Sequence, residues 1–119
     1  MSSAHNQINY IELPANNLGG TKRFYSDLFD WKFTDYGPEY SAFEGAGLAG
    51  GFYKADLKSN SSNGAALVVL YSTNLEASQA LIESAGGEIK VPIFSFPGGR
   101  RFHFLDPNGN ELAVWSDQE

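Results

Sequence analysis

The segment Phe102-His103-Phe104-Leu105-Asp106-Pro107-Asn108-Gly109-Asn110-Glu111-Leu112-Ala113-Val114-Trp115 predicts a β-hairpin near the end of the chain. Its flanks are rich in aromatic and branched side chains, which favour strands. Between them, Pro107 presets its own φ, and Asn108 and Gly109 tolerate the positive φ that a tight turn needs. We expect Asp106 to accept backbone hydrogen bonds across this turn.

The residues ahead of the hairpin predict a strand, a helix and a second strand. The run 65–71 is almost continuously apolar, which predicts a strand that is covered on both faces. Thr73 and Glu76 predict a capping box at the start of a helix. The inner stripe of this helix would be Leu75, Ser78, Ile82 and Ala85, with Gly86 and Gly87 as its stop. Residues 88–91 then predict a strand, and residues 92–99, with two Pro and two Gly, predict a loop.

The first half of the chain has the same order of elements. Residues 8–13 predict a strand that Pro14 ends. Asn16 or Asn17 is expected to cap a helix whose apolar stripe is Thr21, Phe24, Tyr25 and Leu28, and which ends near Phe29. Three further strands are predicted at residues 31–34, 40–43 and 48–54.

The two halves can be overlaid, which places Tyr10 on Leu67 and Asn17 on Asn74. A tandem repeat of one βαβββ unit explains this recurrence. We therefore expect a single α+β domain over residues 1–119, with a first module at 8–54, a linker at 55–64 and a second module at 65–116. An unrelated α+β sandwich is the alternative.

Composition and charge exclude several classes of function. The 119 residues are 42% hydrophobic, which is typical of a globular domain with a core of its own. The net charge of −6 disfavours nucleic acid and anionic membranes as partners. The chain has no cysteine and therefore no disulfide or thiol nucleophile. No secretory signal or membrane span is visible, so a cytoplasmic location is the default expectation.

Several short motifs along the chain together resemble the vicinal oxygen chelate superfamily, which includes glyoxalase I, the bleomycin-resistance proteins, the fosfomycin-resistance enzymes and the extradiol dioxygenases. The matching segments are residues 11–14, Asn17-Leu18, residues 24–31, residues 50–52, residues 85–87 and residues 105–110. The resemblance implies paired βαβββ modules whose curved mixed sheets surround a cleft for a small molecule. It also implies a homodimer.

The resemblance also assigns positions for metal ligands, and none of them carries a ligand here. These positions are Tyr10, Leu67, Gly50 or Gly51, and Ala113. A divalent metal needs three or four converging oxygen or nitrogen donors. We therefore expect no metal and no other cofactor.

Strand alternation predicts which side chains face the cleft that the resemblance implies. They are Tyr10, Glu12, Leu67, Val69, Tyr71, Arg101, His103, Glu111, Ala113 and Trp115. The opposite face is apolar and should pack on the helices. We interpret Tyr10, Leu67, Tyr71, Arg101, Glu111 and Trp115 as ligand-binding residues, and Glu12 and His103 as candidate catalytic residues. Each also has a structural interpretation; Glu12, for example, could simply pair with Arg101.

Three functions are compatible with these residues. The first is metal-independent binding of a small molecule in an aromatic-lined cleft that includes Phe94 and Phe96. The second is a lyase of the glyoxalase type or a related enzyme, with Glu12 or Glu111 as base and His103 as acid. The third is a regulatory or interaction module whose cleft is vestigial.

Overall fold

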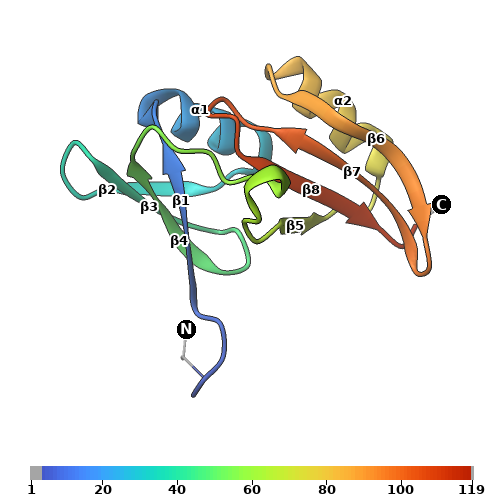
Figure 1. The fold of residues 1–119 in the computed structure, drawn as a ribbon, viewed down its shortest axis with the longest axis horizontal. Coiled ribbons are helices and arrows are strands. Elements are labelled where there is room, and N and C mark those ends of the chain that lie inside the picture. Colours follow the sequence, from blue (N-terminus) through green and yellow to red (C-terminus); the bar gives the residue numbers. More distant parts are fainter. Residues whose placement is uncertain (1–3, 119) are drawn as a thin grey trace. The chain divides into compact units, whose positions relative to one another are not determined.

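The structure is a computed structural model that describes residues 4–118. The chain divides into two compact units, one up to Leu57 and the other from Lys58 onward. Each unit contains a mixed four-stranded sheet and one α-helix, in the order β-α-β-β-β (Figure 1). The α+β fold of repeated βαβββ modules is therefore confirmed.

The sheet of the first unit has the strand order β1-β4-β3-β2. Its elements are β1 (Tyr10–Ala15), α1 (Leu18–Phe29), β2 (Lys32–Asp35), β3 (Tyr40–Glu44) and β4 (Ala49–Lys54). The β1–β4 pair is parallel, and the other pairs are antiparallel. Asn17 caps α1, as expected, by accepting a hydrogen bond from the N–H of Gly20.

The strand β1 does not end at Pro14, as the sequence analysis expected, but continues to Ala15. Because β1 is an edge strand, one side of its backbone needs no partner in the sheet. Proline lacks an N–H, and an edge strand is the place in a sheet where this is tolerated.

The core of the first unit is a stack of aromatic rings between α1 and its sheet. Tyr25 of α1 stacks on Trp31 at 4.6 Å between ring centroids, and Trp31 stacks on Phe43 at 4.7 Å. Phe52 of β4 is fully buried and lies 5.3 Å from Tyr25. Large buried aromatic side chains supply most of the hydrophobic stabilisation in a small unit.

The sheet of the second unit has the equivalent strand order β5-β8-β7-β6. Its elements are the 3₁₀ helix η1 (Ser61–Asn63), β5 (Val68–Tyr71), α2 (Leu75–Ser84), β6 (Glu88–Phe96), β7 (Gly99–Leu105) and β8 (Glu111–Ser116). The β5–β8 pair is parallel, and β6, β7 and β8 run antiparallel to their neighbours.

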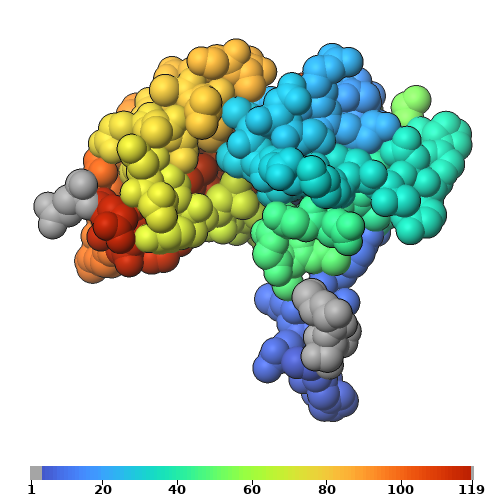
Figure 2. Space-filling model, turned by 180° about the vertical axis from the view of Figure 1, so that it is seen from behind, coloured from blue at the N-terminus to red at the C-terminus, as the bar shows by residue number. Residues whose placement is uncertain are grey.

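One face of the second sheet forms the core against α2. Phe102, Phe104 and Leu112 are fully buried, as is Ile82 of α2. Figure 2 shows the amber side chains of α2 on the surface of this unit. Within residues 4–118, no helix has the length and apolar character needed to cross a membrane.

The predicted hairpin is formed by β7 and β8, and Asp106 organises its turn. The Asp106 carboxylate accepts hydrogen bonds from the backbone N–H of Asn108 at 2.8 Å and of Asn110 at 3.0 Å. Gly109 has a φ of 87°, a value that glycine adopts without a steric cost. The turn therefore forms as the sequence predicted.

Two expectations for β5 and α2 are wrong. The apolar strand β5 is an edge strand, and Val69 and Tyr71 are 42% and 49% exposed, so it is not covered on both faces. The helix α2 is capped by Asn74, whose side chain accepts a hydrogen bond from the N–H of Ala77, and not by Thr73. Asparagine is as effective an N-cap as threonine or better, so local sequence did not discriminate between them.

The loop expected at residues 92–99 is also wrong, because β6 continues through Pro92 to Phe96. The pairing of β6 with β7 shifts register between Ile89 and Val91 and again between Val91 and Phe94. Such bulges let a strand pass a proline, and β6 lies at the edge of the sheet.

Candidate functional site

The face of the second sheet opposite to the core carries the polar side chains. In the β7–β8 ladder, Arg101 lies opposite Trp115, His103 opposite Ala113, and Leu105 opposite Glu111. Directly opposed residues in an antiparallel pair point to the same side of the sheet. The pairing thus places Arg101, His103, Glu111 and Trp115 on one face, as the alternation predicted.

Glu111 is the centre of a buried hydrogen-bond network. Its Oε2 lies 2.7 Å from Nδ1 of His103. Its Oε1 accepts hydrogen bonds from the backbone N–H of Ser61 at 2.9 Å, the Ser61 hydroxyl at 2.7 Å and the ammonium of Lys90 at 3.0 Å. The residue is only 3% exposed. These partners come from β7, β6 and η1, and Ser61 is 50 residues away in sequence.

These contacts determine the charge of Glu111. Burial alone would raise its pKa, but the hydrogen bonds from His103, Ser61 and Lys90 outweigh burial and lower the pKa to about 2. The carboxylate is therefore ionised at neutral pH. It is a poor general base, because a base this weak seldom takes a proton near pH 7. The network instead suits Glu111 for holding His103 in place.

The ionised carboxylate also determines the tautomer of His103. A carboxylate only accepts hydrogen bonds, so Nδ1 of His103 must carry the proton that is shared with Glu111. In the neutral ring, Nε2 then bears a lone pair. This atom is buried and has no hydrogen-bond partner among residues 4–118. The ring of Phe94 lies beside His103, with 6.0 Å between ring centroids.

Arg101 lies two residues before His103 on the same face. Its guanidinium carbon is 5.3 Å from the ring centroid of Phe94 and 5.7 Å from that of Phe96. Both distances are within the range of cation–π attraction. The Nε atom is buried and lacks a hydrogen-bond partner in the described part of the chain. Arg101 is thus fixed by aromatic rings and still has a donor to offer.

Tyr71 and Trp115 continue the aromatic surface at the edge of this face. Their rings meet edge to face at 5.2 Å, and Phe96 lies 6.3 Å from Trp115. The Tyr71 hydroxyl donates a 2.5 Å hydrogen bond to Asp117. This bond raises the pKa of Tyr71 and lowers that of Asp117. The predicted binding residue Leu67 lies one position before β5 and is half-buried.

In the first unit, Tyr10, Tyr40 and Glu12 form a chain of hydrogen bonds. The hydroxyls of Tyr10 and Tyr40 are 2.5 Å apart, and Tyr40 donates to Oε2 of Glu12 at 2.9 Å. Burial is the main cause of a raised pKa of Tyr40, and its bonds with Tyr10 and Glu12 add to the effect. The sequence analysis did not identify Tyr40. The available signal was Gly51, because only a residue without a side chain leaves room for the Tyr40 ring.

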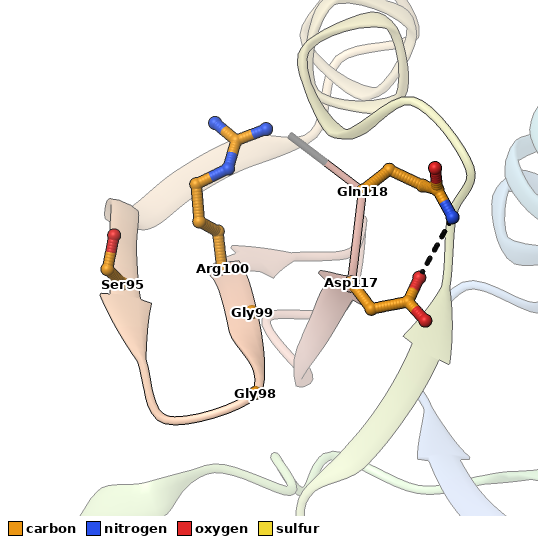
Figure 3. A pocket seen from close by; sticks show the side chains of 6 residues that line it. All are labelled: Ser95, Gly98, Gly99, Arg100, Asp117 and Gln118. Atoms are coloured by element: carbon orange, nitrogen blue, oxygen red, sulfur yellow. Dashed lines mark hydrogen bonds between the residues drawn. The ribbon is translucent and has the colours of Figure 1, made fainter.

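A pocket in the second unit lies apart from the face around Arg101. It is found where the β6–β7 turn approaches the residues that follow β8 (Figure 3). It has a volume of about 300 Å³ and is lined by Ser95, Gly98, Gly99, Arg100, Asp117 and Gln118. Arg100 donates two hydrogen bonds to Glu76, and Asp117 accepts from Tyr71 and Gln118. Because both charged groups already have partners, this pocket is a weaker candidate than the face around Arg101.

The sequence matches the family model of the Glyoxalase/Bleomycin resistance protein/Dioxygenase superfamily over residues 7–114. The chain belongs to this superfamily. The resemblance to the vicinal oxygen chelate proteins is therefore confirmed. No curated protein matches the chain in sequence.

Solved structures of this superfamily share the fold at low sequence identity. A glyoxalase-related enzyme from Fulvimarina pelagi is 18% identical, with a TM-score of 0.76 over 93% of this chain and 88% of the other. The fosfomycin resistance protein FosX from Listeria monocytogenes is 19% identical, with a TM-score of 0.76 over 98% and 94%. The antibiotic binding protein TnmS3 from Streptomyces sp. CB03234 is 16% identical, with a TM-score of 0.69 over 97% and 98%.

The residues at the positions that the resemblance assigns to metal ligands do not fit a metal ion. Tyr40 lies over Gly51, so that even a Cβ on Gly51 would clash with the phenol, and a Cβ on Gly50 would clash with Phe43 and the backbone of Ile11. No group of three or more His, Cys, Asp or Glu side chains within residues 4–118 could hold a metal ion. We therefore derive no chemistry through a metal.

Lys90 and Ser61 are site residues that the sequence analysis did not identify. Ser61 lies in the segment that was interpreted as a linker, and Lys90 lies in a predicted strand whose pairing with β7 was unknown. Both reach Glu111 only through the tertiary fold. The only available signal was the shortage of basic residues, 8 in the whole chain, which makes each lysine a candidate partner for a buried carboxylate.

Proposed function

We propose that this superfamily member binds a small organic molecule on the Arg101–His103 face of its second sheet, without a metal ion. The observation that carries the proposal is the presence of two buried, unpartnered nitrogen atoms, Arg101 Nε and His103 Nε2, among aromatic side chains of the described residues. Buried polar atoms are nearly always hydrogen-bonded, and an exception often marks a functional site. Aromatic walls with a few convergent polar groups are typical of ligand sites.

The aromatic residues around Arg101 supply the apolar part of such a site. Phe94 and Phe96 flank the guanidinium, while Trp115 and Tyr71 extend the surface along β8 and β5. Leu67, which precedes β5, is a further ligand-binding candidate of the second unit. In the first unit, Tyr10 stays a proposed ligand-binding residue and Glu12 a proposed catalytic residue.

The proposal can be tested by a thermal-shift screen followed by titration of the intrinsic tryptophan fluorescence, to which Trp115 and the buried Trp31 both contribute. Replacing Arg101 with Ala should weaken binding of a screened ligand by roughly 1.5–3 kcal/mol, about tenfold or more in affinity. Arg100→Ala is the matched control, because it removes the same charge from the neighbouring residue, which is paired with Glu76. Equal affinities of the two variants, with both folded, would assign Arg101 a structural role. A screen without any ligand would favour a regulatory module.

One observation favours a second candidate function, an enzyme of the lyase class. Glu111 orients His103 through Nδ1, so that the Nε2 atom would act as a general base in the neutral form of the ring. This differs from the roles expected from sequence, in which Glu12 or Glu111 was the base and His103 was the acid. Glyoxalase-type activity that persists in a chelator and is abolished by His103→Gln would support the enzyme. Activity that requires added Ni²⁺, Zn²⁺ or Mn²⁺ would show that the metal positions were misassigned.

We also propose that the chain forms a homodimer. Strand β5 is an edge strand with the exposed side chains of Val69 and Tyr71. Exposed apolar edges favour association with another chain. Light scattering should give twice the monomer mass of 13.0 kDa at micromolar concentration, and the monomer mass would contradict this proposal.

A further inference from the structure

We propose that the ligand on this face is a monocarboxylate with an apolar body, and that its binding takes up one proton at His103. This inference rests on the function proposed above. It adds the chemical class of the ligand and a dependence on pH.

Arg101 supplies the first reason, because its charge is not compensated within the described part of the chain. No carboxylate of residues 4–118 forms a salt bridge with Arg101, whereas its neighbour Arg100 is paired with Glu76. The rings of Phe94 and Phe96 lie against the guanidinium without neutralising it. A planar guanidinium offers parallel N–H donors that match the two oxygens of a carboxylate.

His103 gives the second reason for a carboxylate ligand, and it also explains why binding should take up a proton. With Nδ1–H donated to Glu111, neutral His103 has only an acceptor at Nε2, and a carboxylate has only acceptors. The two can form a hydrogen bond only after Nε2 gains a proton. A bound carboxylate should therefore draw a proton onto the ring, which would then lie between two carboxylates.

The charged groups around His103 are compatible with this change. Glu111 of β8 favours the protonated ring, while Lys90 of β6 and Arg101 on the same strand oppose it. Lys90 and Arg101 are positive and Glu111 is negative, so these three groups have one excess positive charge, and a proton on His103 Nε2 would add another. A monocarboxylate compensates the charge that protonation adds.

The net charge of the chain favours a ligand with one negative charge over a ligand with two. The net charge of −6 repels a phosphoryl dianion about twice as strongly as it repels a monoanion at the same distance. The aromatic surface of Phe94, Phe96 and Trp115 offers contact to an apolar body rather than to further charge.

The test uses matched acids and amides, which have nearly the same shape and differ in charge. Calorimetry would compare benzoate, phenylacetate and 2-naphthoate with the three corresponding carboxamides and with phenyl phosphate. The titrations would be repeated in two cationic buffers whose ionisation enthalpies differ. The difference between the measured heats gives the number of protons taken up, and the buffer itself supplies no anion that competes with the acid. We expect at least one acid to bind about tenfold or more tightly than its amide, as for a charge-assisted contact.

The pH dependence provides the second readout. If the binding of an acid takes up one proton, its affinity should fall about tenfold per pH unit. His103→Gln has a neutral N–H donor that does not titrate, so its acid affinity should not depend on pH. Arg101→Lys should weaken the acids more than the amides, whereas Arg100→Ala should affect neither class.

The outcomes separate this inference from the proposed function. If amides bind as well as acids, or if phenyl phosphate binds best, the ligand class is wrong although the face still binds small molecules. If acids bind without proton uptake, the role of His103 is wrong. If neither acids nor amides bind to the folded wild-type protein, both the inference and its ligand face are overturned.

Discussion

His103 Nδ1 and Glu111 Oε2 lie 2.7 Å apart across the β7–β8 hairpin, and both residues are at least nine-tenths buried. A buried carboxylate is costly unless several donors compensate it. Ser61 and Lys90 provide the remaining donors to Glu111. The hairpin thus holds an oriented imidazole on a surface of aromatic side chains.

Replacing Glu111 with Gln should destabilise the protein in a pH-dependent manner. The pKa of Glu111 is lowered in the folded state to about 2 from an ordinary value of 4.5, so its ionisation stabilises the fold above about pH 4.5. This contribution, roughly 2–4 kcal/mol, is lost as the pH falls toward 2. Urea unfolding of wild type and variant should differ most near pH 6 and converge below pH 3.

The matched control for this prediction is Glu76→Gln. Glu76 also has a lowered pKa because Arg100 donates hydrogen bonds to it, but its side chain is 63% exposed. An exposed ion pair contributes about 1 kcal/mol or less. If both variants lose equal stability at pH 6, the network around Glu111 is not the cause.

Gly51→Ala should destabilise the first unit, because a Cβ at this position would clash with the phenol of Tyr40. Overpacking of this kind typically costs about 1–3 kcal/mol. Gly19→Ala in α1 is the control: its Cβ meets only the Asn17 side chain, at an ordinary 3.8 Å, and helix propensity predicts a gain of up to about 1 kcal/mol. In a double-mutant cycle, Tyr40→Ala should abolish most of the cost of Gly51→Ala. Independent costs would show that the two residues do not touch.

The cap of α2 provides a local test. Asn74→Ala should cost about 1 kcal/mol in thermal or urea unfolding, since the Asn74 side chain accepts a hydrogen bond from the N–H of Ala77. Thr73→Ala, one residue earlier, should change stability by less than about 0.5 kcal/mol. If Thr73→Ala cost more stability than Asn74→Ala, Thr73 would be the cap, as the sequence predicted.

The sequence by itself determined the features that depend on neighbouring residues. Alternation along one strand placed Arg101 and His103 on the same face, because successive side chains of a strand point to opposite sides. The resemblance to the superfamily added Glu111, on the next strand, to that face. The turn at Asp106, and a cap of α1 at Asn16 or Asn17, followed from side chains that bond to backbone groups a few residues away; the structure shows that Asn17 is the cap. The absence of donors at the superfamily's metal positions is also a property of the sequence alone.

Only the tertiary structure decided features that depend on which strand lies next to which. Pro14 and Pro92 are within strands because β1 and β6 are at sheet edges, where a missing N–H is tolerated. Val69 and Tyr71 of β5 are exposed because they lie beside Ala113 and Trp115, on the face of the sheet opposite to the core. The charge of Glu111 depends on Lys90 and Ser61, which are 21 and 50 residues away in sequence. Local periodicity shows the face on which a side chain lies, but it holds no information about the partner that folding brings to it.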